Sequence, residues 1–402
     1  MNKDNLPPRT TPHYAKYQRD IFIKGAEKGE LPEFSTDPEE MERTAKETLS
    51  KGGWLYASSN AGSSWTHKAN REAFYQWKII PRMLVDTNTR DMSCHLTLGT
   101  QTFTFDAPIG FAPIGINKIY HPLGELNSSR IAGGLNLPYA LSTAGSQPVK
   151  EVARVQDEGA KRRKEEGVVG AERRDGREGK GVRWFQLYWP HNDDLTISLL
   201  GSAFESGFEA SFYKGIGQDL GAANPVFVKM CKERGINDMA SPEAGQFWID
   251  NWKRISGGKA FVLKGIQSVA DAKRAAETPG VDGIVVSNHA GRQVDGAIAS
   301  LDALDMIVRS GVANKLTIMF DSGVRSAADV VKALALGAKL VFVGRPYVYG
   351  MSINGEAGVR HVMRSLLADL DILMNVAGFQ NLDQITRDCL LHKPEASLVA
   401  KL

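Results

Sequence analysis

The chain has 402 residues, of which 42% are hydrophobic and 24% charged, and its formal charge at pH 7 is +3. This composition is typical of a globular protein with one large core, and the near-neutral charge argues against nucleic-acid binding as its main function. Three scattered cysteines (Cys94, Cys231 and Cys389) show neither a CxxC pair nor zinc spacing. We therefore expect a reduced, intracellular protein without disulfides or a structural metal. No apolar run approaches the roughly 18 residues that cross a bilayer, so we expect no membrane span.

The first part of the chain, residues 1–105, predicts an N-terminal helical lead-in that packs on the rest of the fold. Its clearest helix covers residues 37–49. Pro38 stands in the first turn of that helix, where proline is tolerated. Residues 1–11 lack the apolar stretch of a signal peptide.

Residues 106–376 alternate short apolar runs with helix-like stretches, which indicates a parallel sheet built from βα units. The expected strands cover residues 108–113, 139–143, 184–189, 260–265, 283–287, 317–321 and 340–344. Between 189 and 260 only the stub Gly207-Phe208-Glu209-Ala210 could supply an eighth. Because eight strands close a (β/α)8 barrel, we predict a TIM barrel whose fourth strand is truncated.

Two further segments stand outside this repeat. Residues 159–183 are rich in Lys, Arg, Glu and Gly, which predicts a disordered or loosely helical surface insertion. Residues 377–402 predict a C-terminal helix and tail. The final Ala400-Lys401-Leu402 resembles the Ser-Lys-Leu address. We therefore expect a peroxisomal location, with the cytoplasm as the alternative.

The segment Ser287-Asn288-His289-Ala290-Gly291-Arg292-Gln293 carries the strongest chemical pattern. It follows the apolar run Gly283-Ile284-Val285-Val286, which predicts a buried parallel strand. In an α/β barrel the C-terminal ends of the strands carry the chemistry. An imidazole there can take a proton near neutral pH, and a guanidinium can bind a carboxylate with two hydrogen bonds. The pair suits a substrate whose acid group lies beside the carbon to be oxidised, although solvated loop residues can show the same pattern.

A second pattern joins Asp321-Ser322-Gly323-Val324-Arg325 to Phe342-Val343-Gly344-Arg345-Pro346. These segments end the last two predicted strands, where barrels of this type bind phosphate through loop amides and a helix N-terminus. The glycines allow close backbone approach, and Arg325 or Arg345 can neutralise the charge. Ordinary βα turns are the alternative reading.

Three weaker patterns indicate a flat ring in the barrel mouth. Phe111-Ala112-Pro113-Ile114-Gly115 ends the first strand with small residues, against which a ring can lie. Gln186 and Tyr188 alternate on the third strand and so share one face. Lys264 ends the fifth strand and needs a partner there, which an electron-rich ring would provide. Packed or surface-capping side chains are the alternative for each.

Together these motifs resemble the FMN-dependent α-hydroxy-acid oxidising enzymes, which include glycolate oxidase, lactate oxidase and lactate 2-monooxygenase. The resemblance covers nearly the whole chain outside 159–183. It is specific at Ser-Asn-His-x-x-Arg-Gln, Leu-Lys-Gly, Phe-Gln-Leu-Tyr and Asp-x-Gly-x-Arg…Gly-Arg-Pro. The sequence around Pro81-Arg82-Met83-Leu84 and Phe185-Gln186-Leu187-Tyr188 is most similar to the lactate 2-monooxygenase branch.

The resemblance implies a role for each matching position. His289 would be the catalytic base, Arg292 and Tyr56 would bind the substrate carboxylate, and Tyr188 would bond the hydroxyl side. The flavin ring would be lined by Ala112, Pro113, Ile114, Ser142, Gln186, Lys264 and Ser287. The ribityl chain and phosphate of FMN would be held by Asp321, Gly323, Arg325, Gly344 and Arg345. No metal is implied.

One segment departs from the family pattern. The family's fourth strand ends in Thr-x-Asp-Thr, and the next loop bears a second substrate-binding arginine. Here Glu209-Ala210 runs directly into Ser211-Phe212-Tyr213-Lys214-Gly215-Ile216-Gly217, which resembles sequence from beyond that loop. The strand, the aspartate that steadies the histidine and the second arginine are therefore expected to be absent. This bears on activity, because losing a charged clamp on a carboxylate costs a few kcal/mol.

The resemblance predicts oxidation of a small L-2-hydroxy acid, with lactate as the first choice, to the 2-oxo acid with O2 as acceptor. Oxidative decarboxylation, as in lactate 2-monooxygenase, would depend on slow product release. Alternatives are a dehydrogenase of the same family with a haem or quinone acceptor, and a barrel enzyme of nucleotide or isoprenoid substrates. A further alternative is an inactive flavin-binding relic or a defective gene model. The family also predicts a homo-oligomer, usually a tetramer.

Overall fold

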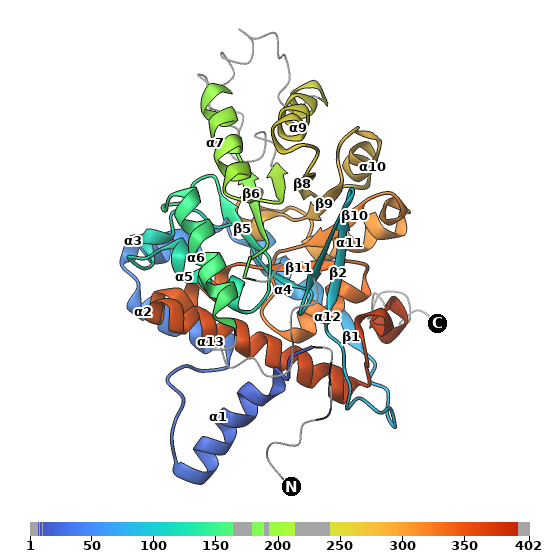
Figure 1. Ribbon diagram of the computed structural model, residues 1–402. Helices are drawn as coiled ribbons and strands as arrows, with labels where there is room; N and C mark the ends of the chain where they lie inside the picture. The colour runs from blue at the N-terminus through green and yellow to red at the C-terminus, as the bar shows by residue number, and fades with distance from the viewer. Residues whose placement is uncertain are drawn as a thin grey trace.

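Eight parallel strands close into a barrel in the computed structural model (Figure 1). The structure describes residues 11–163, 179–188, 193–213 and 242–392, together with Pro7 and Arg9. The barrel strands are β4 (Ile109–Phe111), β5 (Tyr139–Ser142), β6 (Arg183–Leu187), β7 (Ala210–Tyr213), β8 (Ala260–Ile266), β9 (Gly283–Val286), β10 (Thr317–Phe320) and β11 (Leu340–Val343). Each strand lies beside its neighbours in the chain, and β11 pairs with β4 to close the ring. The predicted TIM barrel is confirmed.

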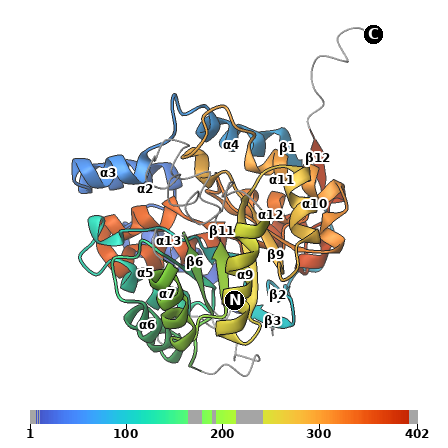
Figure 2. The ribbon, with the colours of Figure 1, turned by 90° about the horizontal axis from the view of Figure 1, so that it is seen from above.

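A helix follows each barrel strand within the described residues, and these helices surround the barrel (Figure 2). They are α5 (Glu125–Gly134), α6 (Val149–Lys161), α7 (Asp193–Glu205), α9 (Pro242–Ser256), α10 (Val269–Glu277), α11 (Ser300–Arg309), α12 (Ala327–Ala335) and α13 (Arg345–Ala377). Short 3₁₀ turns also occur at η1 (Asn117–Ile119), η5 (His289–Gly291) and η6 (Val312–Asn314). The last helix, α13, is kinked at Asn354 and Gly355.

The fourth strand is present, so the prediction of a truncated or missing strand was wrong. Strand β7 pairs with β6 through Trp184 and Ala210, and with β8 through Ala210 and Ala260. The sequence concealed it because the outward-facing residues of β7 are polar. Buried hydroxyls of Ser211 and Tyr213 find no hydrogen-bond partner among the described residues. An unsatisfied buried group costs about 1–3 kcal/mol, so β7 closes the barrel at some expense in stability.

The core has an inner layer inside the barrel and an outer layer between strands and helices. Aromatic rings fill the inner layer. The ring centroids of Trp184 and Phe212 lie 5.1 Å apart, and those of Phe212 and Phe342 lie 5.6 Å apart. Because these rings occupy the axis, the barrel is a packed core and only its mouth is free for a ligand.

The N-terminal lead-in contains strands as well as helices. Its helices are α1 (Ala15–Lys28), α2 (Pro38–Thr48), α3 (Lys51–Ser58) and α4 (Trp65–Gln76), and its strands are β1 (Trp77–Ile79), β2 (Cys94–Leu98) and β3 (Gln101–Phe105). Helix α2 confirms the helix expected over 37–49, with the Asp37 carboxylate accepting a hydrogen bond from Glu39 N at 2.9 Å. The antiparallel pair β2–β3 packs Phe103 and Phe105 against Trp184 and so covers one end of the barrel.

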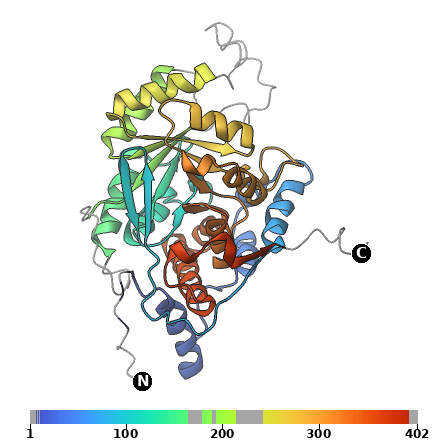
Figure 3. The ribbon, with the colours of Figure 1, turned by 90° about the vertical axis from the view of Figure 1, so that its right-hand side faces the viewer.

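A buried carboxylate fastens the lead-in to α13. Asp371 is fully buried and accepts hydrogen bonds from Arg9 Nη1, Arg90 Nε and Ala15 N, each at 2.9 Å. Helix α1 buries no side chain fully and projects away from the barrel (Figure 3). The bonds to Asp371 therefore hold this segment where hydrophobic packing is thin.

The two segments outside the repeat differ from expectation. Residues 378–392 hold two 3₁₀ turns, η7 (Leu382–Gln384) and η8 (Arg387–Cys389), and strand β12 (Leu390–His392), where a helix was expected. Strand β12 pairs with β1, and this pairing satisfies its backbone instead. At the start of the expected insertion, Gly159 lies within α6, where a Cβ would be 2.0 Å from Arg130 O of α5. At its expected end, Arg183 is buried and begins strand β6, so the insertion is shorter than predicted. Residues 164–178 and Ala400-Lys401-Leu402 lie outside the described residues.

Two features are absent from the described part of the chain. Among its helices, none combines the length and the apolar character that crossing a membrane requires. Within the same residues, no group of His, Cys, Asp or Glu side chains is arranged to hold a metal ion.

Candidate active site

The C-terminal ends of the barrel strands border one cavity, with a volume of about 160 Å³. Every predicted site residue lines the cavity except Ser287, which bonds to the lining residue Lys264. By origin they are Tyr56 from α3; Ala112, Pro113 and Ile114 after β4; Ser142, Gln186 and Tyr188 from the β5 and β6 ends; Lys264 from β8; His289 and Arg292 after β9; Asp321, Gly323 and Arg325 after β10; and Gly344 and Arg345 after β11.

His289 lies in a tight turn, η5, directly after β9. The backbone φ is +56° at both His289 and Ala290, a left-handed conformation that side chains other than glycine disfavour. Such a conformation costs about 1–3 kcal/mol per residue and persists only where its surroundings enforce it. The enforcing bonds include His289 N to Ser287 Oγ at 3.1 Å and Ala290 N to Ser322 Oγ at 3.0 Å. The imidazole therefore borders the cavity because the backbone of this turn is held in a strained conformation.

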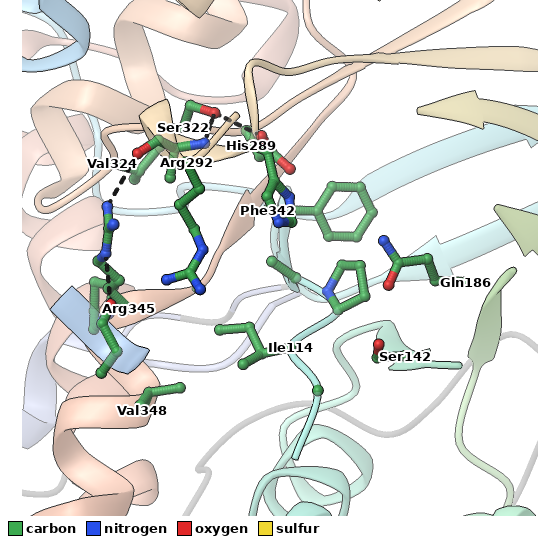
Figure 4. A pocket seen from close by; sticks show the side chains of 18 of the residues that line it. Ile114, Ser142, Gln186, His289, Arg292, Ser322, Val324, Phe342, Arg345 and Val348 are labelled. Carbon is green, nitrogen blue, oxygen red and sulfur yellow. Dashed lines mark hydrogen bonds between the residues drawn. The ribbon is translucent and has the colours of Figure 1, made fainter. Parts of the chain in front are cut away.

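Arg292 lies three residues further along the same loop and borders the same space (Figure 4). Its Nη1 donates to Tyr56 O at 2.6 Å, and its guanidinium carbon lies 5.0 Å from the centroid of the Tyr56 ring. This cation–π contact orients the guanidinium while leaving other N–H donors for a ligand. The two residues expected to bind a carboxylate therefore touch each other.

Lys264 and Asp321 form a buried ion pair, with Nζ 2.8 Å from Oδ2. Lys264 Nζ also donates to Ser287 Oγ at 2.9 Å, and Ser322 Oγ donates to Asp321 Oδ1 at 2.8 Å. Burial alone would raise the pKa of Asp321, but Lys264 and the hydroxyl donors hold that pKa below its usual value. The network therefore keeps a charged ammonium group at the cavity wall.

Another part of the cavity wall combines apolar side chains with two polar ones. Ile114, Ser142, Gln186 and Phe342 border the cavity together in Figure 4. Gln186 is 1% exposed, and its Nε2 has no hydrogen-bond partner among the described residues. Because a buried amide donor without a partner is costly, this atom indicates that a ligand with an acceptor belongs in the cavity.

The Arg345 side chain is already committed to the protein. Its guanidinium donates to Ala57 O, Ser59 O, Ala290 O, Asn60 Oδ1 and His67 Nδ1, at distances from 2.7 to 3.2 Å. These five bonds use all five N–H groups of an arginine. Burial lowers the pKa of Arg345 to about 10, and the nearby Arg325 and Arg292 act in the same direction. Arg345 can therefore attract an anion by its charge and backbone, while its side-chain donors tie α3 to the His289 turn.

The sequence predicts two possible phosphate positions, at the N-termini of α12 and α13. Of these two, only the N-terminus of α13 has no side chain capping it. At the start of α12, Asp329 Oδ2 already accepts from Arg325 N at 2.8 Å and Ser326 N at 3.2 Å. The cap of α13 is Gly344, and no side chain caps this end. Arg325 also lines the cavity. A phosphate suits this end of α13, because the helix dipole favours negative charge there.

Several supporting residues were missed from the sequence. His67, on α4, must accept from Arg345 through a neutral Nδ1, and burial with the charges of Arg345 and Arg325 lowers its pKa to about 4. Glu125, fully buried, accepts from Asn117 N, Asn117 Nδ2, Ser146 N and Ser146 Oγ, and so joins the loops after β4 and β5. His67 lies far from the motifs in sequence, and Glu125 belongs to no motif, so no local pattern reveals either residue.

A closed (β/α)8 barrel whose mouth joins a histidine–arginine loop, a buried lysine and an open phosphate position defines a flavin-dependent oxidoreductase. Residues 45–214 and 232–392 match the model of the FMN-dependent dehydrogenase family. The chain belongs to that family, whose members named below oxidise α-hydroxy acids with FMN, and the expected family and cofactor are confirmed.

Individual relatives agree. The chain is 37% identical over 413 residues to an FMN-dependent alpha-hydroxy acid dehydrogenase of Penicillium citrinum, covering 94% of this chain and 96% of the relative. It is 34% identical over 373 residues to an L-lactate oxidase of Lysinibacillus sphaericus, covering 86% and 89%. Among solved structures, an active mutant of (S)-mandelate dehydrogenase superposes with a TM-score of 0.73 at 27% identity, covering 89% of this chain and 100% of that one.

The residues present fit FMN on structural grounds. The Gln186 amide supplies an unused donor to a ring, and Lys264 supplies a positive charge at the cavity wall. The uncapped end of α13 with Arg325 suits a phosphate. These groups lie in one cavity.

Proposed function

We propose that this protein oxidises a small L-2-hydroxy acid, with L-lactate as the leading candidate, to the 2-oxo acid, and that O2 is the electron acceptor. The observation that carries the proposal is the shared cavity: His289 and Arg292, from one loop, border the same space as Lys264 and Gln186. A proton acceptor, a carboxylate binder and a cofactor site are the three parts that such a reaction needs.

The chain's own residues bind and orient the substrate. Arg292 would hold the carboxylate by two hydrogen bonds, with Tyr56, whose ring already contacts the guanidinium, as its partner. Tyr188 would bond the hydroxyl side of the substrate. His289 Nε2 or Nδ1 would take a proton from the bound acid. Bound FMN would supply the two-electron acceptor.

The cofactor would be held by the remaining lining residues. Ala112, Pro113, Ile114, Ser142, Gln186, Lys264 and Ser287 would surround the ring, with Lys264 stabilising negative charge that develops on it. Asp321, Gly323, Arg325, Gly344 and Arg345 would hold the ribityl chain and phosphate. For Arg345 the contribution would come from charge and backbone, since its side-chain donors are engaged.

Crowding around the guanidinium supports a small substrate. The ring centroids of Tyr56 and Tyr120 lie 6.4 Å apart, and both side chains line the cavity. Tyr120 is 7% exposed and cannot move aside without disturbing the core. Two aromatic rings beside Arg292 leave little room for a bulky substituent, which favours lactate or glycolate over an aromatic acid.

One observation favours a second candidate, an inactive flavin-binding relic. The chain lacks the Thr-x-Asp-Thr sequence of the family's fourth strand, and β7 instead buries two unsatisfied hydroxyls. A monooxygenase outcome, which depends on slow product release, remains a prediction, and so does an acceptor other than O2. A homo-oligomer and a peroxisomal address also stay predictions.

The test is anaerobic mixing of the FMN-loaded protein with L-lactate, glycolate, L-mandelate and D-lactate, following the flavin absorbance near 450 nm. Bleaching by L-lactate and glycolate, weaker bleaching by L-mandelate and none by D-lactate is the expected result. Admission of O2 should restore the colour, with hydrogen peroxide and pyruvate as products of an oxidase, or acetate and CO2 as those of a monooxygenase. FMN binding without bleaching by any acid would support the relic, and recovery of colour only with a quinone would refute O2 as acceptor.

A further inference from the structure

Helix α4 packs against the back of the His289 turn through a pair of buried asparagines. Asn70 Nδ2 donates to Asn288 Oδ1 at 2.8 Å, and Asn288 Nδ2 donates to Asn70 Oδ1 at 2.7 Å. The two side chains are 2% and 3% exposed. A reciprocal amide pair fixes both side chains in one orientation, because turning either amide over would place like groups against each other.

Asn288 connects this amide pair to the backbone of the His289 turn. Its Oδ1 also accepts from Gly291 N at 3.1 Å, and its Nδ2 also donates to Ile298 O at 3.0 Å, so all four hydrogen-bonding positions of the amide are used. Its backbone N donates to Ser300 Oγ at 2.9 Å, and Ser300 N donates to Asn70 Oδ1 at 3.0 Å. The network therefore spans both ends of the loop that carries His289 and Arg292.

The turn needs this support because its backbone is strained. His289 and Ala290 are both left-handed, and Gly291, with a φ of +77°, lies so close to α4 that a Cβ would be 2.7 Å from His67 N. Two adjacent left-handed side-chain residues relax readily when their bonds weaken. Relaxation of this turn would shift the imidazole relative to the cavity.

We propose that Asn70 is a positioning residue: through Asn288 it sets the conformation of the His289 turn and thereby the place of the imidazole against the substrate. The proposal rests on the proposed function for its catalytic consequence and deepens it. Asn70 is not among the residues that line the cavity, and its side chain acts from α4 through bonds to Asn288 and Ser300. Substrate affinity and FMN affinity should therefore depend on it little.

The test uses Asn70→Asp in the full-length, FMN-loaded protein. A carboxylate keeps the acceptor for Asn288 Nδ2 but repels Asn288 Oδ1, which pulls the Asn288 amide away from Gly291 N. Backbone amides in peptides covering 287–292 should then exchange hydrogen at least about tenfold faster. The rate of flavin reduction at saturating L-lactate should fall about 100-fold, the order expected for a catalytic group displaced by about 1 Å, with KM and the FMN Kd within about threefold of wild type.

The matched control is Gln156→Glu, the same amide-to-acid change at a fully buried side chain on α6, whose Nε2 donates to Val182 O at 2.9 Å away from the cavity lining. It should leave both the exchange of 287–292 and the reduction rate unchanged. If Asn70→Asp does not fold, Asn70→Ser removes the same donor without adding charge and should give the same pattern.

Unchanged exchange of the turn in both Asn70 variants overturns the proposal, whatever the rate does. A loss of FMN binding that accounts for the whole loss of rate overturns it as well. If no hydroxy acid reduces the wild-type flavin, the proposed function fails, while the exchange experiment still decides whether Asn70 holds the turn.

Discussion

Replacing Lys264 by methionine tests the buried polar network at the cavity wall. Lys264 is 5% exposed, and its Nζ contacts Asp321 Oδ2 at 2.8 Å and Ser287 Oγ at 2.9 Å. The variant leaves a buried carboxylate without its cation, and breaking a buried pair from one side costs about 3–5 kcal/mol of unfolding free energy. Since a domain's whole stability is about 5–15 kcal/mol, the urea midpoint at pH 8 should fall sharply.

The pH dependence of this loss gives a second readout. In the wild type the pKa of Asp321 is held below its ordinary value of 3.8, so the pair stabilises the fold above that pH and the contribution is lost as the pH falls through the folded pKa. In Lys264→Met the burial of Asp321 is opposed only by the hydroxyl donors Ser287 and Ser322, so its pKa rises. The carboxyl then takes up a proton as the pH falls from 8 to 5, and the difference between variant and wild type should shrink.

Lys253→Met is the matched control for this prediction. Lys253 Nζ lies 2.6 Å from Asp282 Oδ2, but the two side chains are 25% and 13% exposed. A partly solvated pair should lose about 1 kcal/mol or less, at either pH. Both variants are unfolded in urea at pH 5 and pH 8 with the same excess of FMN. Equal losses in the two variants, or a Lys264→Met loss independent of pH, would refute the reasoning.

Three further outcomes are expected. Asp371→Asn leaves two buried arginines facing a neutral side chain, and should lower the unfolding free energy by about 3–5 kcal/mol in urea titrations. His67→Gln keeps an acceptor for Arg345 but removes a group whose pKa is lowered from 6.5 to about 4. The unfolding free energy of the wild type should fall as the pH drops from 6.5 to 4, because the unfolded state then binds a proton that the folded state does not. This part of the pH dependence of stability should be absent in the variant. Arg325→Met removes a charge beside the open end of α13, and should weaken FMN binding about 10- to 100-fold by fluorescence titration while the reduction rate of the loaded enzyme stays near wild type.

The fold was largely predictable because parallel strands buried on both faces appear as short apolar runs. Seven strands were found in this way. Strand β7 was not, since Ser211 and Tyr213 interrupt its apolar pattern, and its pairing is decided by β6 and β8 on either side. Strand β12 was missed for a similar reason, because its partner β1 lies more than 300 residues earlier in the chain.

The cavity lining was predictable because chemistry concentrates at strand ends, where motifs such as His-x-x-Arg are local in sequence. The residues that hold the lining residues in place from outside the cavity were not predictable. Asn70 meets Asn288 across 218 positions, and nothing near either residue indicates that contact. Asparagine inside a helix is unfavourable by itself, but its presence in α4 does not identify the partner.

The most direct measurement of the central claim is single-turnover flavin reduction in His289→Gln. We expect FMN to bind as in the wild type, because His289 is not among the residues proposed to hold the cofactor. Reduction by L-lactate should slow by about 10²- to 10⁴-fold, the range expected when a general base is lost, with the substrate Kd little changed. Reduction at the wild-type rate in this variant would show that the imidazole after β9 is not the base, and would contradict the account.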